Sequence, residues 1–410
     1  MPDISFNGLL AVAAIAVTAP LLVNLAPALR VPAVVLEIVA GIVLGPSGLG
    51  WVELDLPIQV LGLIGLAFLL FLAGLEIDVH GLRGPRLRIT GLGYLITIAI
   101  GIAVGVAFSG VGWVDSPLLL AITLSATSLG LVVPVLKDAR QADGEVGQLT
   151  ITAASIADFS AILLLTVFFS QSSTGTGTKL LFIGGFALFA VAAALALSRA
   201  GMSMGLDALL TRLQDTTAEI RVRIAVLVLV GFVALAEHLG LEAILGAFLA
   251  GAILNLVDRD TATHPRFRLK LEAIGYGFLV PVFFVSSGLR FDLDALLDRP
   301  SALARVPLFL AALLVVRGVP ALLYAAGIGR RQAMAAALLQ ATSLPFIVTA
   351  SQIGLLLGEY SAATAAGLIA AGLLSVVVFP PLALGLLRPR DIGSPDESGP
   401  IAGVGAALGT

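Results

Sequence analysis

The sequence predicts an all-α polytopic membrane protein with about 13 transmembrane helices, arranged as two inverted-topology repeats with crossed broken helices. Three observations predict this fold: the composition, the spacing of the apolar segments, and motifs that recur in the second half. Hydrophobic residues make up 59% of the 410 residues and charged residues 12%, against about 45–50% and 25% in a soluble domain. A single soluble core cannot bury so large an apolar share, so we assign the chain to the membrane.

The composition also excludes several classes of function. The chain has no cysteine, which excludes disulfides and thiolate metal sites. Its three histidines, His80, His238 and His264, are too scattered to form a metal cluster. We therefore expect neither an enzyme nor a cofactor, and no nucleic-acid partner. The N-terminus lacks the basic region of a cleaved signal peptide and is expected to lead into the first span.

Windows of about 20 residues place the apolar spans in chain order. Two of them, 31–46 and 241–257, are short for a full crossing. The predicted spans are 5–27, 31–46, 57–76, 88–110, 116–137, 146–171, 178–200, 220–239, 241–257, 271–290, 302–327, 331–357 and 361–387.

These spans divide the chain into three parts. The first repeat, with one linking span, covers residues 1–200, and the second repeat covers 201–390. Residues 391–410 are rich in Gly, Pro and Ser, a composition typical of disorder. We expect this last segment to be a disordered cytoplasmic tail.

The basic residues indicate the orientation. With the N-terminus outside, the inner loops hold 18 of the 23 Lys and Arg residues, the outer loops hold four, and Arg317 lies within a span. Cytoplasmic loops carry such an excess of positive charge, and one miscounted span would reverse every later loop. We therefore expect a multi-pass protein of the inner (plasma) membrane with a cytoplasmic C-terminus.

Three motifs of the first half recur in the same order in the second half, at separations of about 210 to 215 residues. The pairs are 39–44 with 249–254, 69–78 with 282–292, and 126–129 with 341–344. The separation equals seven predicted crossings, and an odd number inverts the second half relative to the first. Inverted repeats are typical of secondary transporters that work by alternating access.

The repeated motif ATSL indicates the candidate site. Gly130 follows the first copy and Pro345 the second, and Gly or Pro beside small hydroxyl residues disfavours a continuous helix. Two matching interruptions predict broken helices that meet near the midplane. Their hydroxyls would offer oxygen ligands to an alkali cation, or they only bond within their own helices and aid packing. These hydroxyls belong to Thr127, Ser128, Thr342 and Ser343.

Asp158 is an unpaired carboxylate near the middle of span 146–171. An ionised carboxylate in hydrocarbon costs at least ~2.5–3.5 kcal/mol. Either Asp158 is a protonated structural residue, or it faces a water-filled cavity and exchanges a proton for another ion; we favour the second. By the repeat separation Asp158 maps near Leu373 and Arg317 near Ala103. The two charges in mid-membrane are therefore unique additions to a symmetric scaffold.

Several stretches together resemble the monovalent cation/proton antiporter superfamily, nearest the branch of bacterial sodium/proton and glutathione-gated potassium/proton exchangers. They run nearly from end to end and are specific in combination. The stretches are 36–46, 71–78, 124–128, 156–158, 245–251 and 283–289.

The resemblance implies roles for single residues. Asp158 matches the essential carboxylate that binds either a proton or the transported cation, and Thr127 and Ser128 match the crossover helix that lends oxygens. Arg317 matches the membrane-embedded Lys or Arg of the second half; the alternative is a structural guanidinium that satisfies helix-end carbonyls. Glu37 matches a polar position of uncertain function. The candidate ion- and proton-binding residues are Asp158, Thr127, Ser128 and Ser155, with the monovalent cation at Asp158, supporting charges at Arg317 and Glu37, and Thr342 and Ser343 in the second broken helix.

The chain departs from the resembling exchangers at Ala157. Relatives usually place Asp, Asn or Gln there, and a second acid at this position accompanies electrogenic exchange and is the partner of the basic residue. We therefore predict electroneutral exchange of one cation for one proton. The counter-charge of Arg317 stays open, with Asp158 and Glu37 as candidates.

The predicted function is exchange of Na⁺ or K⁺ for protons, with a core bundle rocking against a panel that forms a homodimer in the lipid bilayer, as the resemblance implies. A sodium-coupled symporter of a small organic anion is the alternative, but it would need more polar or aromatic residues around the crossover. A channel has no need of matched halves. A membrane enzyme would need a catalytic pair that the sequence does not offer.

Overall fold

The computed structural model describes residues 6–25, 32–77, 84–138, 140–169, 219–257, 265–298 and 300–387, with short pieces between 177 and 192. All regular structure in these ranges is helical. Six helices are long and apolar enough to cross a membrane, or seven if one bent pair counts as a span. The expected all-helical fold with several spans is confirmed. Most of predicted span 178–200 and all of tail 391–410 lie outside the described residues.

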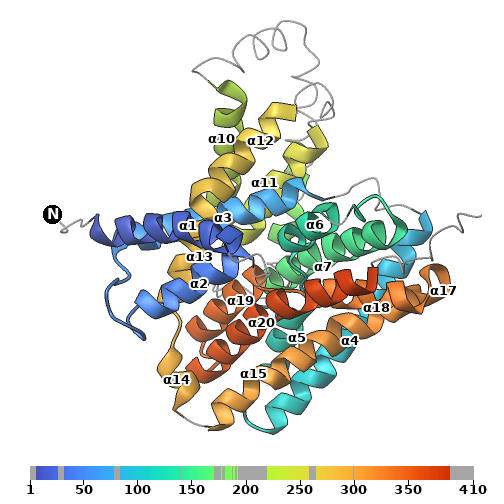
Figure 1. Cartoon of the computed structure of the whole chain (residues 1–410). Helices are drawn as coiled ribbons and strands as arrows, with labels where there is room; N and C mark the ends of the chain where they lie inside the picture. Colours follow the sequence, from blue (N-terminus) through green and yellow to red (C-terminus); the bar gives the residue numbers. More distant parts are fainter. Residues whose placement is uncertain are drawn as a thin grey trace, which may run out of the picture.

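Each of the other predicted spans corresponds to a helix or to a set of consecutive helical segments (Figure 1). In chain order they are α1 (Asn7–Leu25), α2 (Ala33–Leu44), α3 (Leu56–Leu75), α4 (Gly84–Gly110), α5 (Pro117–Ser125), α6 (Leu129–Asp138), α7 (Glu145–Phe169), α10 (Ile220–His238), α11 (Ala243–Val257), α12 (Pro265–Ile274), η2 (Gly275–Leu279), α13 (Val280–Leu289), α14 (Leu293–Leu297), α15 (Pro300–Leu313), η3 (Leu314–Gly318), α16 (Val319–Ala321), η4 (Leu322–Tyr324), α17 (Ala325–Ile328), α18 (Arg330–Gln340), α19 (Pro345–Leu356) and α20 (Ala362–Leu387).

Side-chain caps fix where two of the central helices begin. Asp55 Oδ1 accepts a hydrogen bond of 3.0 Å from the Ile58 amide at the start of α3. Ser116 Oγ accepts one of 3.3 Å from the Leu119 amide at the start of α5. A cap of this kind satisfies one of the first free amides of a helix. Both helices also have Pro in their first turn, where its missing N–H costs nothing.

Helix breaks are present at both copies of ATSL. Residues 126–128 separate α5 from α6, and residues 341–344 separate α18 from α19, which are bent by 43°. At the second break Leu344 precedes Pro345, and the proline ring disfavours a helical conformation in the residue before it. The first break has no proline at its end, so tertiary contacts must hold it open.

Two π-helical segments, η2 and η3, interrupt two long helical runs, 265–289 and 300–328. Pro281 follows η2, and the Val280 amide bonds to the Gly275 carbonyl five residues earlier. Pro320 follows η3. A proline has no N–H to donate and its ring displaces the preceding turn, which favours a wider turn at that point. π-helical turns occur often at functional sites, and η3 contains Arg317.

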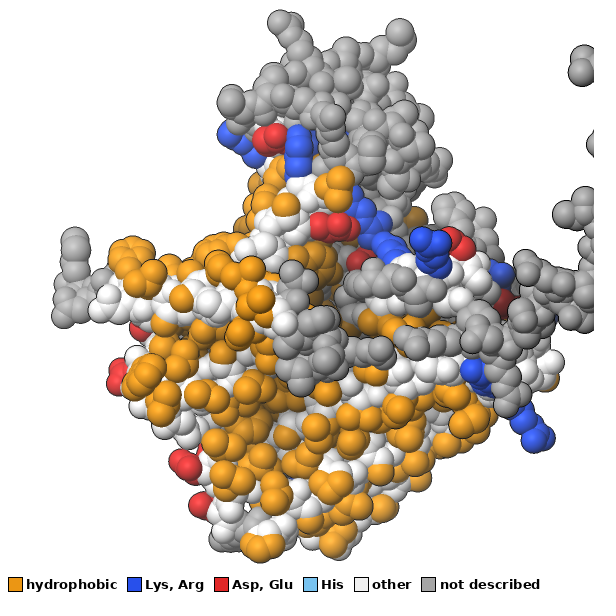
Figure 2. Space-filling view, in the orientation of Figure 1, with side chains coloured by type: hydrophobic (Ala, Val, Ile, Leu, Met, Phe, Trp, Pro, Cys, Tyr) orange, Lys and Arg blue, Asp and Glu red, His pale blue; other side chains and the backbone are white. Residues whose placement is uncertain are grey.

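The helices form two groups. One group, here called the panel, consists of α1–α3 and α10–α13, and the other, here called the core bundle, consists of α4–α7 and α15–α20; contacts are dense within each group and sparse between them. In the face shown in Figure 2, Lys and Arg side chains gather toward the upper and right-hand parts of the molecule, and a broad hydrophobic surface lies below them.

Two close helix crossings hold the panel together, and each depends on a pair of glycines. At the crossing of α2 with α13, a Cβ on Gly41 would lie 3.0 Å from the Gly288 Cα. At the crossing of α3 with α11, a Cβ on Gly74 would lie 3.1 Å from the Gly251 Cα. Backbones can approach this closely only without side chains between them.

A side chain bonds to a backbone carbonyl beside each crossing. Ser47 Oγ donates to the Phe291 carbonyl oxygen over 2.9 Å, and Asn255 Nδ2 donates to the Ile77 carbonyl oxygen over 2.7 Å. Each bond satisfies a carbonyl that follows the end of a helix, α13 in the first case and α3 in the second. The two crossings are therefore built in the same way from different parts of the chain.

Candidate functional site

Asp158 projects from α7 toward the first helix break. Its Oδ1 accepts a hydrogen bond of 3.1 Å from the Thr127 amide, and its Oδ2 accepts a longer one of 3.4 Å from the Leu129 amide. Leu129 is the first residue of α6. The carboxylate therefore lies at the positive end of a helix dipole and binds free amides there, an arrangement that stabilises its negative charge.

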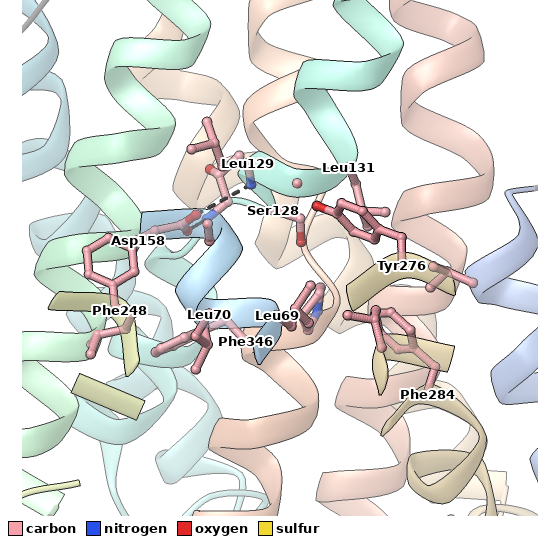
Figure 3. Close-up of a pocket in the computed structure, with 17 residues that line it drawn as sticks. Leu69, Leu70, Ser128, Leu129, Leu131, Asp158, Phe248, Tyr276, Phe284 and Phe346 are labelled. Atoms are coloured by element: carbon pink, nitrogen blue, oxygen red, sulfur yellow. Dashed lines mark hydrogen bonds between the residues drawn. The ribbon is translucent and has the colours of Figure 1, made fainter. Parts of the chain in front are cut away.

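The Asp158 side chain also lines a pocket between the core bundle and the panel, with an empty volume of about 640 Å³ including its open mouth. Figure 3 shows Asp158 on one side of this pocket and Tyr276 and Phe284 on the other. The remaining walls come from α3, α6, α11 and the start of α19. Asp158 is thus only partly buried, and its carboxylate borders the pocket.

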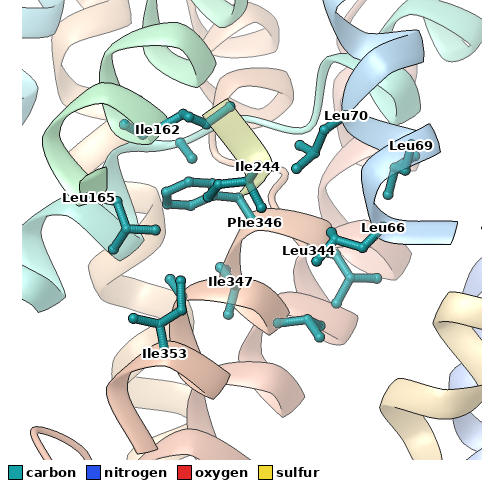
Figure 4. Packing of buried hydrophobic residues seen from close by; sticks show 14 of the residues in the cluster. Leu66, Leu69, Leu70, Ile162, Leu165, Ile244, Leu344, Phe346, Ile347 and Ile353 are labelled. Carbon is teal, nitrogen blue, oxygen red and sulfur yellow. The ribbon is translucent and has the colours of Figure 1, made fainter. Parts of the chain in front are cut away.

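Below the pocket the two groups of helices meet in a continuous layer of buried hydrophobic side chains (Figure 4). Leu69, Leu70, Ile162 and Phe346 belong both to the pocket wall and to this layer. Figure 4 labels ten of its residues: Leu66, Leu69, Leu70, Ile162, Leu165, Ile244, Leu344, Phe346, Ile347 and Ile353. An apolar layer of this kind makes the passage of an ion on this side of the pocket costly.

Arg317 is the largest fully buried side chain in the described part of the chain, with 1% of its surface exposed. Its Nε and Nη2 donate to Thr127 Oγ1 over 2.9 and 2.7 Å, and its Nη1 donates to Thr97 Oγ1 over 3.4 Å. Thr127 Oγ1 in turn donates to the Gln340 carbonyl oxygen over 2.6 Å. Through these bonds the guanidinium joins the first break to the helix that precedes the second break.

Neither candidate counter-charge pairs directly with Arg317: within the described ranges no carboxylate oxygen lies within 4.0 Å of the guanidinium. Asp158 is joined to it through Thr127, whose amide bonds to Asp158 and whose hydroxyl bonds to Arg317. The charge of Arg317 therefore acts on Asp158 across one residue. Glu37 is buried on α2 and does not line the pocket.

The Thr127 hydroxyl is fully used in this conformation. It donates one hydrogen bond and accepts two, which is all that a hydroxyl group can form. Thr127 therefore orients Asp158 and Arg317 here, and its hydroxyl has no lone pair left for a cation. Ser128 lines the pocket, and its Oγ accepts a hydrogen bond of 2.9 Å from the Leu344 amide.

The second break lies against the first. The Ser128 amide donates to the Thr342 carbonyl oxygen over 2.9 Å. Thr342 Oγ1 bonds back to the Leu338 carbonyl oxygen, and the Ser343 amide donates to Ser375 Oγ over 3.2 Å. The Ser343 hydroxyl is buried without a hydrogen-bond partner among the described residues.

Ser155 lies one helical turn before Asp158 and is buried. Its Oγ donates to the Ile151 carbonyl oxygen over 3.0 Å, and the residue does not line the pocket. Its hydroxyl is therefore bonded within α7. A role for Ser155 as an ion ligand stays a prediction.

Sequence reasoning missed three polar residues of this region. Thr97 accepts from Arg317, Ser375 caps the second break, and Tyr276 lines the pocket from the panel. Thr97 and Ser375 carry no local signal, because isolated hydroxyls are common in membrane helices. Tyr276 did carry a local signal, because it stands between two glycines and a few residues before Pro281.

The arrangement can hold one monovalent cation or one proton. Asp158 supplies a carboxylate stabilised by amides on one side and open to the pocket on the other. Within the ranges given above, no three His, Cys, Asp or Glu side chains group to bind a metal.

Comparison with known proteins shows which family the chain resembles. Residues 13–384 match the family described as sodium/hydrogen exchanger, transmembrane. The chain is 31% identical over 270 residues to a Na⁺/H⁺ antiporter of Enterococcus hirae, covering 64% of this chain and 67% of that protein. It is 29% identical over 358 residues to the glutathione-regulated potassium-efflux system protein KefC of Salmonella heidelberg (strain SL476), covering 84% of this chain and 56% of that protein.

Two further similarities each cover 92% of this chain. The chain is 31% identical over 393 residues to YjbQ of Bacillus subtilis (strain 168), a protein assigned as a Na⁺/H⁺ antiporter, and the match covers 92% of this chain but 62% of that protein. The structure of the sodium proton antiporter MjNhaP1 from Methanocaldococcus jannaschii superposes with a TM-score of 0.63 at 18% identity, covering 92% of this chain and 97% of that chain. This second likeness establishes the fold.

Proposed function

The chain belongs to the transmembrane sodium/hydrogen exchanger family, and from that premise we propose that it exchanges a monovalent cation, Na⁺ or K⁺, for protons through the Asp158 pocket. The chain is a multi-pass membrane protein with six or more apolar spans. The observation that carries the proposal is a carboxylate bound to the free amides of a broken helix and open to a pocket.

Exchange follows from competition at one carboxylate. Ionised Asp158 attracts a cation, while the Thr127 and Leu129 amides hold its oxygens in place. Protonation removes the charge that holds the cation, and the cation leaves. Passage of the empty ionised site through an apolar layer is costly, so the site crosses the membrane only when it is loaded. Obligatory exchange follows.

The two groups of helices supply the movement. The core bundle carries Asp158 and both breaks, and it meets the panel at the pocket and at the apolar layer. Rocking of one group on the other would open the layer and close the pocket, as alternating access requires. The panel is then the surface through which two copies of the chain form a homodimer.

Inverted repeats covering 1–200 and 201–390 are supported by the two glycine crossings. Gly41 and Gly251 occupy equivalent places in the repeated motifs, as do Gly74 and Gly288. Each crossing joins one motif of the first half to the other motif of the second half. A two-fold relation between halves produces such an exchange of contacts. The predicted linking span 178–200, which completes the proposed count of 13, lies mostly outside the described residues.

The orientation is the one predicted from the loops, with the N-terminus outside and the C-terminus in the cytoplasm of a bacterial-type inner membrane. The uneven distribution of Lys and Arg side chains supports it (Figure 2). In this orientation the end of α3 next to the pocket-lining Ala73 lies toward the inside.

One carboxylate per site makes the exchange one cation for one proton and electrically silent. Asp158 is the acidic residue in the described lining of the pocket, and Ala157 leaves no second acid beside it. Symport of an organic anion is disfavoured, because the pocket wall is mostly aliphatic and aromatic and carries no cation to bind such an anion.

The test is proton flux in proteoliposomes that carry a pH-sensitive dye, with Na⁺, K⁺ or Li⁺ added in turn. Wild-type protein is expected to respond to at least one of these ions without generating a membrane potential, and Asp158→Asn is expected to be silent while remaining folded. Flux that survives Asp158→Asn would contradict the role of this carboxylate. A potential that builds up during exchange would contradict the stoichiometry.

The same assay tests how the apparent KM for the cation depends on pH. Because protons and the cation compete for Asp158, the apparent KM for the cation is expected to fall as the pH rises. At low pH it changes by about tenfold per pH unit, because each cation must displace one proton. A KM that is independent of pH would show that the two ions bind at separate places.

A further inference from the structure

The face of α3 that lines the pocket continues past its end to a second carboxylate. Leu69, Leu70 and Ala73 line the pocket, and residues three or four apart share one face of a helix. Glu76 is three residues beyond Ala73, and its backbone is still helical, with φ −87° and ψ −5°. In the proposed orientation α3 is the third span and ends at the inner face, so Glu76 lies about one turn from the pocket-lining Ala73 toward the inside.

Two cations, Arg268 and Lys137, act on the charge of Glu76, and of these only Arg268 comes within 4.0 Å of its carboxylate. Its side chain is 9% exposed, and its Oε1 lies 3.9 Å from Arg268 Nη2. Arg268 has a better partner, because its Nε donates to Glu272 Oε1 over 3.0 Å. Glu76 Oε2 is buried and has no hydrogen-bond partner in the described part of the chain. A buried carboxylate oxygen without a partner costs free energy that a bound cation can recover.

Tyr276, which also lies on the panel, brings a second oxygen to the wall of the Asp158 pocket. It lies on η2, is 41% exposed, and lines the Asp158 pocket. A Cβ on Gly130 would lie 3.4 Å from the Tyr276 hydroxyl, so the phenol oxygen lies over the start of α6. Figure 3 shows this hydroxyl directed into the pocket from the side opposite Asp158. Tyr276 is four residues beyond Glu272 and eight beyond Arg268, so it shares one helix face with the residue that Glu76 contacts.

We propose that Glu76 and Tyr276 form a staging site that holds a partly hydrated monovalent cation between the inner surface and Asp158. Glu76 Oε2 supplies the charge, the Tyr276 hydroxyl supplies a neutral oxygen, and water completes the shell. Alkali cations prefer such hard oxygen ligands. Arg268 limits the affinity of this site, because its guanidinium competes for Glu76. The inference deepens the proposed function and rests on it.

The experiment measures cation-driven proton flux in membrane vesicles of both orientations, with the cation supplied either from the inner or from the outer face. Glu76→Gln is expected to raise the KM for the cation roughly five- to tenfold from the inner face and to leave the outer face unchanged. Tyr276→Phe removes only the hydroxyl and is expected to raise the inner-face KM about twofold. Arg268→Gln is expected to lower it.

Glu53→Gln is the matched control: it makes the same chemical change at an exposed residue just before the other end of α3, and its KM is expected to equal that of the wild type. A purely structural Glu76–Arg268 pair would lower the melting temperature of both variants and leave KM unchanged, and that result would overturn the staging site. If exchange depends on Asp158 but Glu76→Gln keeps the wild-type KM from both faces, the staging site alone is wrong. If exchange survives Asp158→Asn, the proposed function itself fails.

Discussion

The two helix breaks have the same four residues, ATSL, but different means keep them open. At the break between α18 and α19, Pro345 follows directly and the cap is the neutral Ser375 hydroxyl. At the break between α5 and α6 no proline follows directly, and the cap is the Asp158 carboxylate with Arg317 bonded to Thr127 beside it. The first break is thus charged and held by tertiary contacts, and the second is neutral and determined locally.

Environment explains why the charge is confined to the first break. Asp158 borders the pocket and is only partly buried. Ser375 is completely buried, and an ionised group there would have no water and no route to the surface. Both breaks border the pocket, but only the first brings a carboxylate to it. The comparison teaches that two matched breaks supply the scaffold, whereas the charged one carries the proposed ion site.

Replacing the charged cap by the neutral one gives the largest expected effect. In Asp158→Ser the hydroxyl can still accept a bond from a backbone amide of the first break, so the protein should fold. Cation-driven proton flux in proteoliposomes is expected to drop to the level of protein-free vesicles, because no charge remains to hold the ion. A measurable rate of exchange by Asp158→Ser would show that the functional difference between the two breaks does not depend on the charge of the cap.

Arg317→Ala removes the buried guanidinium that keeps the first break open. We expect a loss of about 2–5 kcal/mol in stability, because a large buried side chain leaves a cavity and Thr127 and Thr97 lose their donors. Thermal unfolding of the purified protein in detergent measures this loss. The preference among Na⁺, K⁺ and Li⁺ is expected to stay the same, and a changed preference would mean that Arg317 acts on the ion directly.

Thr127→Val and Thr342→Val are a matched pair at equivalent places in the two breaks. Thr127→Val removes the acceptor of two guanidinium bonds, and we expect a loss of about 1.5–3 kcal/mol. Thr342→Val removes only a bond back to its own helix, worth about 0.6 kcal/mol in a membrane protein. Unfolding midpoints of the two variants test the difference. Equal losses would mean that Arg317 does not depend on the Thr127 hydroxyl.

Ser375→Ala is expected to have a small effect, comparable to that of Thr342→Val. The cap of the second break is lost, but Pro345 and the Ser128 contacts remain, so stability should fall by about 0.6–1 kcal/mol. KM for the cation is expected to match that of the wild type. A raised KM would mean that the second break contributes to the ion site after all.

The sequence by itself determined the class of the protein, the positions of the helices, both breaks and the central acid. These follow from local causes: long apolar runs require a membrane, and Gly, Pro and small hydroxyl residues weaken a helix where they stand. Asp158 could be singled out because a lone carboxylate in an apolar run is costly wherever the run is folded.

Only the tertiary structure decided what the central charges touch. Arg317 bonds to Thr127 and not to Asp158 or Glu37, and Tyr276 reaches the pocket from a helix more than 100 residues later in the chain. Glu76 belongs to a motif that sequence reasoning used to find the repeat and the family resemblance, without giving Glu76 a role of its own. Such partners come from segments far apart in sequence, and their pairing depends on how the helices pack across the bundle. No local sequence pattern predicts this packing.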